Sequence, residues 1–114
     1  MPQEPLQIED LSSAEGQRVL RLNGPIVITN LFQFQSMVRA DASKTLILDL
    51  SKVPYIDSAG IGALVGAYVT HQKEGRNLAL VGVTERVRNT MQVTRVDTFF
   101  KFYDSLDAAQ ASAA

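Results

Sequence analysis

The sequence has 114 residues, of which 46% are hydrophobic and 20% are charged. Eleven Lys and Arg residues against twelve Asp and Glu residues give a formal net charge of -1, which argues against a surface that tracks a nucleic-acid backbone. The chain has no cysteine and one histidine, which excludes a disulfide framework, a thiol nucleophile and a zinc site built from cysteine and histidine.

The first elements of the chain predict a β-hairpin. Residues 6–11 and 18–22 alternate apolar and polar side chains, which is typical of strands with one buried face. The turn-rich residues 12–16 lie between these strands, and the sequence Asn23-Gly24-Pro25 ends the second one.

A helix and a buried strand follow the hairpin. Thr29 or Asn30 can cap a helix that runs to about Ala40. The inner face of this helix carries apolar residues at helical spacing, namely Leu31, Phe34 and Val38. Residues 45–50 (TLILDL) are almost entirely apolar, which is typical of a strand buried on both faces.

The same alternation of helix and strand continues in the second half. Residues 58–74 predict a helix that ends at Gly75, because glycine is the preferred residue just after a helix. Residues 78–81 predict another buried strand. A further helix begins at Thr84-Glu85, and its inner face carries Val87 and Met91.

The C-terminal residues predict one more strand and a short helix. We expect the strand over residues 98–103, with Asp104 or Ser105 capping the helix that follows. Residues 108–114 are small and polar, so we expect them to form a frayed tail. The folded core then covers about residues 5–107.

The order of these elements predicts an α/β fold. Strand and helix alternate from Thr45 onward, which implies parallel strands with right-handed crossovers, while the hairpin makes the sheet mixed. We expect one domain over residues 1–114, with a small sheet of about five strands and about four flanking helices. No run approaches the ~20 apolar residues of a membrane span, and no secretion signal is visible, so we expect a cytoplasmic protein.

The segment from Asp49 to Gly62 leads from a buried strand into a helix. Pro54 keeps the strand from continuing, and Ser58 lies at or beside the helix N-cap, where several backbone N–H groups lack partners. Asp and Ser are common N-cap residues, so capping alone accounts for Asp57 and Ser58. The segment by itself leaves a structural role and a functional role open.

The helix after Ser58 has two different sides. One side carries a stripe of core-type residues: Ile61, Leu64, Val65, Tyr68 and Val69. The other side carries small residues at the same spacing: Ala59, Gly62, Ala63, Gly66, Ala67 and Thr70. Glycine inside a helix costs roughly 1 kcal/mol relative to alanine. A neighbouring segment of the chain and a protein partner would explain such a smooth side equally well.

Catalytic chemistry finds little support in the sequence. His71 lies on the same helix as Ser58, roughly 20 Å away at about 1.5 Å of rise per residue, which is too far for a Ser–His pair. We expect His71 to be solvated near the helix end. The glycines at 60, 62 and 66 miss the dinucleotide-binding spacing, and no P-loop is present. We therefore predict no enzyme activity, no cofactor and no metal site.

Two further groups of charged residues suggest no chemistry of their own. Asp49 is near the same strand end as Asp57, but no base or metal cluster accompanies it, so we interpret it as structural. Arg86, Arg88 and Arg95 form a modest basic group around the third helix, which we expect to be a solvated surface.

The motif Asp57-Ser58-Ala59-Gly60, set within residues 46–68 (LILDLSKVPYIDSAGIGALVGAY), resembles the central motif of STAS domains, particularly those of bacterial anti-sigma factor antagonists. The similarity extends over nearly the whole chain. Gly24 ends the second strand, Gly75 closes the second helix, and residues 97–109 (DTFFKFYDSLDAA) resemble the last strand and helix of the family.

This resemblance implies a regulatory cycle. In the family, a partner anti-sigma factor that is itself a serine kinase phosphorylates the serine of the motif, and a phosphatase reverses the modification. The unphosphorylated form sequesters the anti-sigma factor and frees the sigma factor for transcription. Ser58 would then be the phosphorylation site. The implied partner-binding surface comprises Asp57, Ala59, Gly60, Gly62, Ala63 and Gly66.

The chain departs from the family pattern after Gly24. Members often carry an acidic residue a few positions further on, whereas residues 25–28 here are Pro-Ile-Val-Ile. A docking role without phosphorylation therefore stays open, as does a structural STAS subunit of a larger signalling scaffold or lipid-transport complex. A small-molecule or nucleotide-binding domain has only the helix N-terminus in its favour. A homodimer is compatible with each of these functions.

Overall fold

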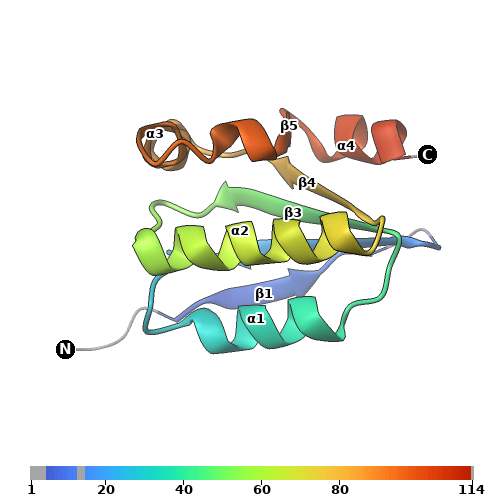
Figure 1. Cartoon of the computed structure of the whole chain (residues 1–114), viewed down its shortest axis with the longest axis horizontal. Helices are drawn as coiled ribbons and strands as arrows, with labels where there is room; N and C mark the ends of the chain where they lie inside the picture. The colour runs from blue at the N-terminus through green and yellow to red at the C-terminus, as the bar shows by residue number, and fades with distance from the viewer. Residues whose placement is uncertain (1–4, 13–14, 114) are drawn as a thin grey trace.

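The computed structural model describes residues 5–12 and 15–113 and shows a sheet flanked by helices (Figure 1). The five strands are β1 (Gln7–Asp10), β2 (Gln17–Asn23), β3 (Thr45–Lys52), β4 (Asn77–Val81) and β5 (Lys101–Tyr103). The helices are α1 (Leu31–Ala40), α2 (Ser58–Lys73), α3 (Glu85–Val93), the 3₁₀ turn η1 (Asp97–Phe99) and α4 (Leu106–Ala113).

The sheet is mixed and its strands lie in chain order, β1-β2-β3-β4-β5. β1 pairs antiparallel with β2, whereas the β2–β3, β3–β4 and β4–β5 pairs are all parallel. The expected α/β class, the mixed sheet, the five strands and the four helices are therefore confirmed. The hairpin turn was expected over residues 12–16, and its residues 13 and 14 lie outside the described part of the chain.

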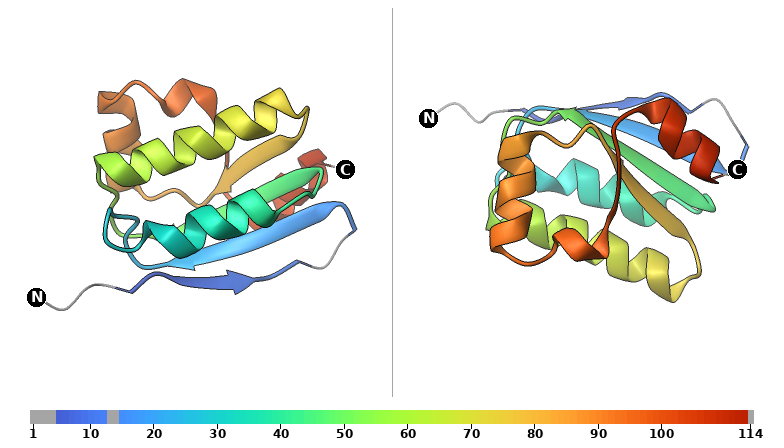
Figure 2. Two further views of the ribbon diagram at one scale, coloured as in Figure 1. Left: turned by 60° about the horizontal axis from the view of Figure 1, so that its bottom comes forward. Right: turned by 90° about the horizontal axis from the view of Figure 1, so that it is seen from above.

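Each face of the sheet has its own apolar core, because side chains alternate along a strand. α1 and α2 cover one face, and α4 lies on the other (Figure 2). The larger core joins α1, α2 and α3 to alternate strand residues, among them Leu20, Leu22, Leu46, Leu48 and Leu80. The smaller core lies on the α4 face and contains Val19, Ile47, Ala79, Val81 and Ala109.

The expectation of a frayed tail over residues 108–114 is wrong for the described part of that segment. α4 continues to Ala113, and Ala109 is only 1% exposed against the second face of the sheet. Ser105 caps the helix as expected, since its Oγ accepts from the Ala108 N–H at 3.1 Å. The helix persists because β3 and β4 are apolar on both sides, so their second face needs a cover.

The last strand is shorter than residues 98–103. Asp97–Phe99 forms a 3₁₀ turn, and only Lys101–Tyr103 pairs with β4. Aromatic packing accounts for this difference. The ring of Phe99 stacks on Tyr68 of α2 at 5.5 Å, and Phe100 meets the same tyrosine edge-on at 5.7 Å. These contacts draw the start of the segment away from the sheet and onto the helix layer.

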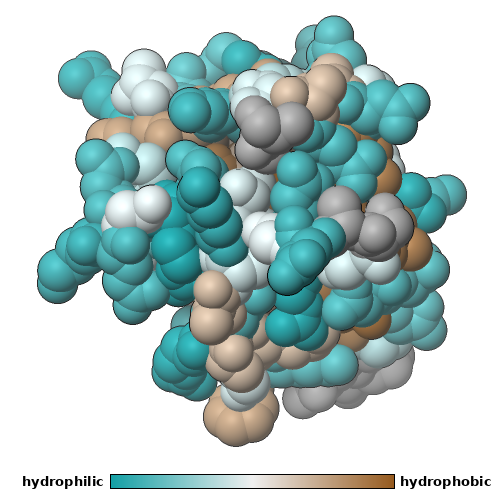
Figure 3. Space-filling view, turned by 90° about the vertical axis from the view of Figure 1, so that its right-hand side faces the viewer, coloured by the Kyte–Doolittle hydropathy of each residue, from teal (hydrophilic) through white to brown (hydrophobic). Residues whose placement is uncertain are grey.

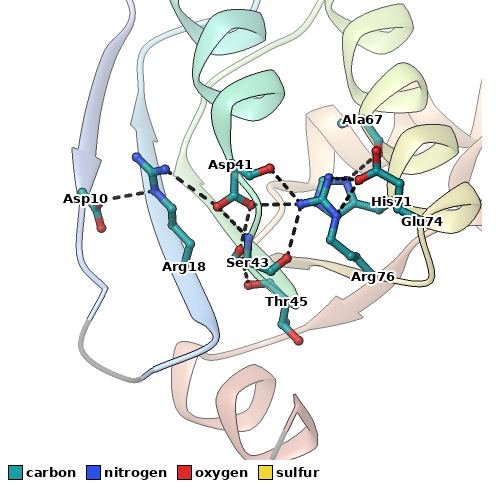
Figure 4. A network of polar contacts seen from close by, with 9 residues as sticks. All are labelled: Asp10, Arg18, Asp41, Ser43, Thr45, Ala67, His71, Glu74 and Arg76. Carbon is teal, nitrogen blue, oxygen red and sulfur yellow. Dashed lines mark hydrogen bonds and ion pairs between the residues drawn. The ribbon is translucent and has the colours of Figure 1, made fainter.

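A buried carboxylate ties three elements together at the end of the molecule where α1 and α2 finish (Figure 4). Asp41 follows α1 and is 5% exposed. Its carboxylate lies 3.8 Å from Arg18 of β2 and 3.6 Å from Arg76, which precedes β4. It also accepts from the Ser43 hydroxyl at 2.7 Å. Two guanidinium groups and a hydroxyl therefore compensate one desolvated charge.

Replacing Asp41 with alanine should be far more costly than replacing Asp10, which pairs with the same Arg18 at 3.3 Å but has a side chain that is 46% exposed. We expect Asp41→Ala to lower the free energy of unfolding by about 2 kcal/mol, because it removes the buried acceptor that Arg18, Arg76 and Ser43 share. Asp10→Ala should cost at most about 1 kcal/mol. Urea unfolding of both variants tests this, and equal losses would contradict the role of burial.

Candidate functional site

Ser58 is positioned by two loop segments that cross at the carboxyl end of β3. The segment after β2 and the segment after β3 form a parallel bridge between Ile26 and Ile56. The Ile26 N–H donates to the Tyr55 carbonyl at 3.2 Å, and the Asp57 N–H donates to the Ile26 carbonyl at 3.2 Å. This pairing extends the sheet contact beyond the strands and fixes the place where α2 begins.

Asp57, rather than Ser58, is the N-cap of α2. Its Oδ1 accepts from the Gly60 N–H at 2.8 Å, which is a conventional capping bond. Its Oδ2 accepts from the Ile28 N–H at 3.0 Å, in the segment that leads to α1. One carboxylate therefore fixes the start of α2 and holds the β2–α1 segment against it. The sequence indicated the cap, but not the second bond.

Ser58 is the first residue of α2, and its side chain is exposed. Its hydroxyl forms no hydrogen bond with any residue of the described ranges. Because Asp57 already satisfies the cap, Ser58 is not needed for that role. The Ser58 hydroxyl is thus exposed at the helix start and serves no structural bond among the described residues.

Gly60 lies beneath this surface rather than on it. The residue is buried, and a Cβ placed on it would lie 2.2 Å from the Ile26 carbonyl oxygen and 2.6 Å from Ile56. The crossing of the two loops therefore requires glycine here. This corrects the expectation from the family motif that Gly60 contributes to the partner-binding surface directly.

Gly62 and Gly66 differ from Gly60. Both are exposed, and a Cβ added to either would meet no atom of the described residues within 4 Å other than its chain neighbours and the backbone of its own helix. Intramolecular packing therefore does not explain these two glycines, whereas Ala67 on the same side of α2 is 5% exposed and packs in the larger core. Ala63 is half-buried between the two glycines, and Ala59 near the helix start is half-buried against the core.

The two exposed glycines open onto a groove of about 860 Å³ between α1 and α2. Its apolar walls include Phe34, Val38, Gly62, Ala63, Gly66 and Ala67. The end of the groove away from Ser58 is lined by charged residues, among them Arg39, Glu74 and Arg76. Glu74 and Arg76 belong to the Asp41 network (Figure 4). The smooth side of α2 is thus one wall of an open groove whose lining begins at Gly62, one helical turn after Ser58.

The inward face of α2 differs from expectation at three residues, the first being Ala67, which was expected on the small-residue side but is 5% exposed in the larger core. His71 is 1% exposed, and its Nδ1 lies 2.7 Å from the Ala67 carbonyl oxygen, so the expectation of a solvated histidine is wrong. It continues the buried row of Leu64 and Ala67 by one more helical turn. Val69, by contrast, is 46% exposed, because it lies at the far edge of the apolar stripe.

Asp49 is structural, as expected. It is buried at the end of β3, and its Oδ2 lies 3.0 Å from the Arg21 Nε. Burial alone would raise the pKa of the Asp49 carboxyl, but hydrogen bonds from Ser51 and the Arg21 guanidinium outweigh burial and hold that pKa below its usual value. The carboxylate is thus kept charged by its partners and is not poised for proton transfer.

The basic residues around α3 are exposed, but two of them cover aromatic rings. The Arg86 guanidinium lies 5.0 Å from the centre of the Tyr55 ring, and the Arg88 guanidinium lies 3.7 Å from that of Phe102.

No cluster of three metal-ligating side chains occurs within residues 5–12 and 15–113. None of the helices in this part of the chain has the length and apolar character that a bilayer crossing requires.

Comparison with known proteins adds a family assignment. A model of the STAS domain matches residues 9–109. A Thermotoga neapolitana protein, named a candidate anti-sigma factor antagonist and TM1081 homologue, is 34% identical over 64 residues, which is 56% of this chain and 57% of that protein. The anti-sigma-B factor antagonist of Staphylococcus aureus is 25% identical over 67 residues, or 59% and 62% of the two chains. The matches therefore span less than two thirds of either relative's length.

Solved structures agree on the fold. The Thermotoga maritima protein TM1081 superposes with a TM-score of 0.81 and 26% identity over 96% of this chain and 92% of its own. The anti-sigma factor antagonist SpoIIAA superposes in its unphosphorylated form with a TM-score of 0.74 and 19% identity, covering 95% and 96% of the two chains. The phosphorylated form of SpoIIAA, from Bacillus, superposes with a TM-score of 0.72 and 17% identity, covering 94% of this chain and 98% of its own.

Two of the three glycines of α2, Gly60 and Gly66, provide a matched test of this geometry. Gly60→Ala should lower the free energy of unfolding by about 2 kcal/mol, because its methyl group would overlap a backbone carbonyl. Gly66→Ala should raise it by about 0.5–1 kcal/mol, because alanine is the better helix former and the space is open. Thermal unfolding of the two variants distinguishes them, and a destabilised Gly66→Ala would mean that the groove is occupied within the molecule.

Proposed function

The chain belongs to the STAS domain family, and from this premise we propose that it is an anti-sigma factor antagonist switched by phosphorylation of Ser58. The proposal rests above all on the exposed Ser58 hydroxyl, which has no partner among the described residues although it opens a well-capped helix. The names of the relatives from Thermotoga and Staphylococcus support the same class of function.

The partner of the unphosphorylated form is an anti-sigma factor with serine kinase activity. Its contact surface on this chain includes Ser58, the exposed part of Asp57, and the open wall formed by Gly62, Ala63 and Gly66. Glycines that cost helix stability without any intramolecular contact are explained when a partner's backbone or side chains approach closely. The chain acts by binding, and it performs no chemistry of its own in this cycle.

Phosphorylation would leave the fold intact. A phosphate on Ser58 adds about -1.5 to -2 charge at the N-terminal end of a 16-residue helix, where backbone N–H groups and the helix dipole favour an anion.

The same phosphate would disrupt the complex. It would lie next to the Asp57 carboxylate, and burying both charges in an interface costs several kcal/mol unless a cation of the partner compensates them. A shift in occupancy from 99:1 to 1:99 needs ~5.5 kcal/mol, which the charge penalty and the bulk of the phosphate can supply together. A phosphatase that removes the group restores binding, and the cycle thereby controls transcription that depends on the released sigma factor.

A structural subunit of a larger assembly is the second candidate. The open groove beside Gly62 and Gly66 favours it equally, since a permanent neighbour would also cover this wall. Such a subunit would bind its neighbours whatever the charge at residue 58, so charge dependence separates the two functions.

Substitutions at Ser58 test the switch. Ser58→Asp should fold with an unchanged melting temperature but lose binding to the kinase-type anti-sigma factor of its own genome, whereas Ser58→Ala should bind and resist phosphorylation. Ser112→Asp serves as the control, because Ser112 lies on α4, which covers the opposite face of the sheet. It adds the same charge and should bind like the wild type. Calorimetric titration measures all three, and equal affinity of Ser58→Asp and Ser58→Ala would contradict the proposal.

A further inference from the structure

Two large apolar side chains are exposed on the segment that adjoins Ser58. Ile28 lies between β2 and α1 and is 69% exposed, and Phe32 in the first turn of α1 is 78% exposed. The Ile28 N–H is the group that Asp57 holds, at 3.0 Å from Oδ2. Figure 1 shows that α1 and α2 begin at the same end of the molecule. Ile28 therefore lies beside the start of α2, and the first turn of α1, which carries Phe32, lies at the same end of the molecule.

The segment is rigid rather than loosely exposed. Asn30 braces it from within: its Oδ1 accepts from the Val27 N–H at 3.1 Å, and its Nδ2 donates to the Pro25 carbonyl at 2.8 Å. The Asn30 N–H also donates to the Val27 carbonyl at 3.0 Å, which forms a turn over residues 27–30. Leu31 is buried next to Phe32, which fixes the rotation of α1. Anchors held in place before binding lose little conformational entropy on association.

The segment that carries these two side chains is itself uncharged, and the charged group beside it is Asp57, which accepts from the Ile28 N–H. Residues 25–38 contain no Asp, Glu, Lys, Arg or His, so the first charged group on α1 is Arg39 in its last turn. The opposite end of the molecule, which carries the Arg18, Asp41 and Arg76 network, is mostly hydrophilic (Figure 3). A partner that contacts Ile28 and Phe32 therefore presents apolar surface to these two side chains.

We propose that Ile28 and Phe32 are the anchor residues by which this chain recognises its partner, and that the anti-sigma factor receives them in an uncharged, apolar recess beside its contact with Ser58. This inference rests on the proposed function, because it names the partner's surface at that same site. It follows from the continuity of the patch with Ser58 through the Asp57 hydrogen bond, and from the absence of charge along residues 25–38.

Asp57 connects this recognition to the switch. Its carboxylate holds the Ile28 N–H and the Gly60 N–H at once, directly beside the residue that receives the phosphate. The partner must accommodate the apolar patch and the Ser58 hydroxyl in one continuous surface. A charge at residue 58 is then unfavourable on two counts, because it is desolvated and because it adjoins an apolar contact.

Polar substitutions that preserve the backbone test the anchors. We expect Phe32→Gln to weaken binding to the purified anti-sigma factor at least tenfold and the double variant Ile28→Thr/Phe32→Gln to weaken it further, as is usual for central apolar anchors. The control is Val93→Thr, because Val93 is also highly exposed, at 82%, but lies in the last turn of α3. It should change the affinity less than threefold. Calorimetry should also give a less negative heat-capacity change for the double variant.

The outcomes separate this inference from the proposed function. If the wild type binds and Ser58→Asp does not, but the Ile28 and Phe32 variants bind like Val93→Thr, the anchors are refuted and the switch stands. If the wild type binds no anti-sigma factor, the proposed function fails and the anchors fail with it. Sedimentation is the third measurement: a wild-type dimer that Phe32→Gln converts to monomer assigns the patch to a second copy of the chain and overturns the inference. Circular dichroism melts confirm that each variant is folded.

Discussion

The carboxylate of Asp57 is the interaction on which the site depends. One oxygen caps α2 through the Gly60 N–H, and the other holds the Ile28 N–H of a segment that lies almost thirty positions earlier in the sequence. Because the cap is supplied by Asp57, the hydroxyl of Ser58 is left exposed at the first helical position. The same carboxylate makes the site sensitive to a second negative charge, since a phosphate on the next residue would adjoin it.

The sheet places this carboxylate. β3 is buried on both faces and ends at the loop where the β2–α1 and β3–α2 segments cross, and Gly60 allows α2 to begin directly under the Ile26 carbonyl. The buried Asp41 with its two arginines secures the far end of the helix layer. The molecule is thus fixed at both ends, and the wall that carries Gly62 and Gly66 stays open between them.

Much of this fold can be predicted from periodicity, because the apolar residues of β2, β3 and α1 and the capping residues of α3 and α4 act locally. What escapes prediction depends on contacts between distant residues. The end of α4, from residue 108 onward, looks like a frayed tail in the sequence, because its order depends on the packing of Ala109 against Val19 and Ile47 on the second face of the sheet. The 3₁₀ turn before β5 depends on Tyr68, and His71 is buried by its place on the inward row of α2.

The candidate site divides in the same way. Ser58 stands out in the sequence as part of a capping motif, but the bond from Asp57 to Ile28 and the collision that makes Gly60 obligatory cannot be predicted without the loop crossing. The signal that could have directed attention to Ile28 and Phe32 is the uncharged run of residues 25–38.

Phosphopeptide mass spectrometry of the native protein, combined with the affinity of the phosphorylated fraction for the anti-sigma factor, tests the central claim most directly. The account predicts phosphate on Ser58 and no measurable binding by that fraction; phosphate elsewhere only, or binding equal to that of the unmodified protein, would contradict it.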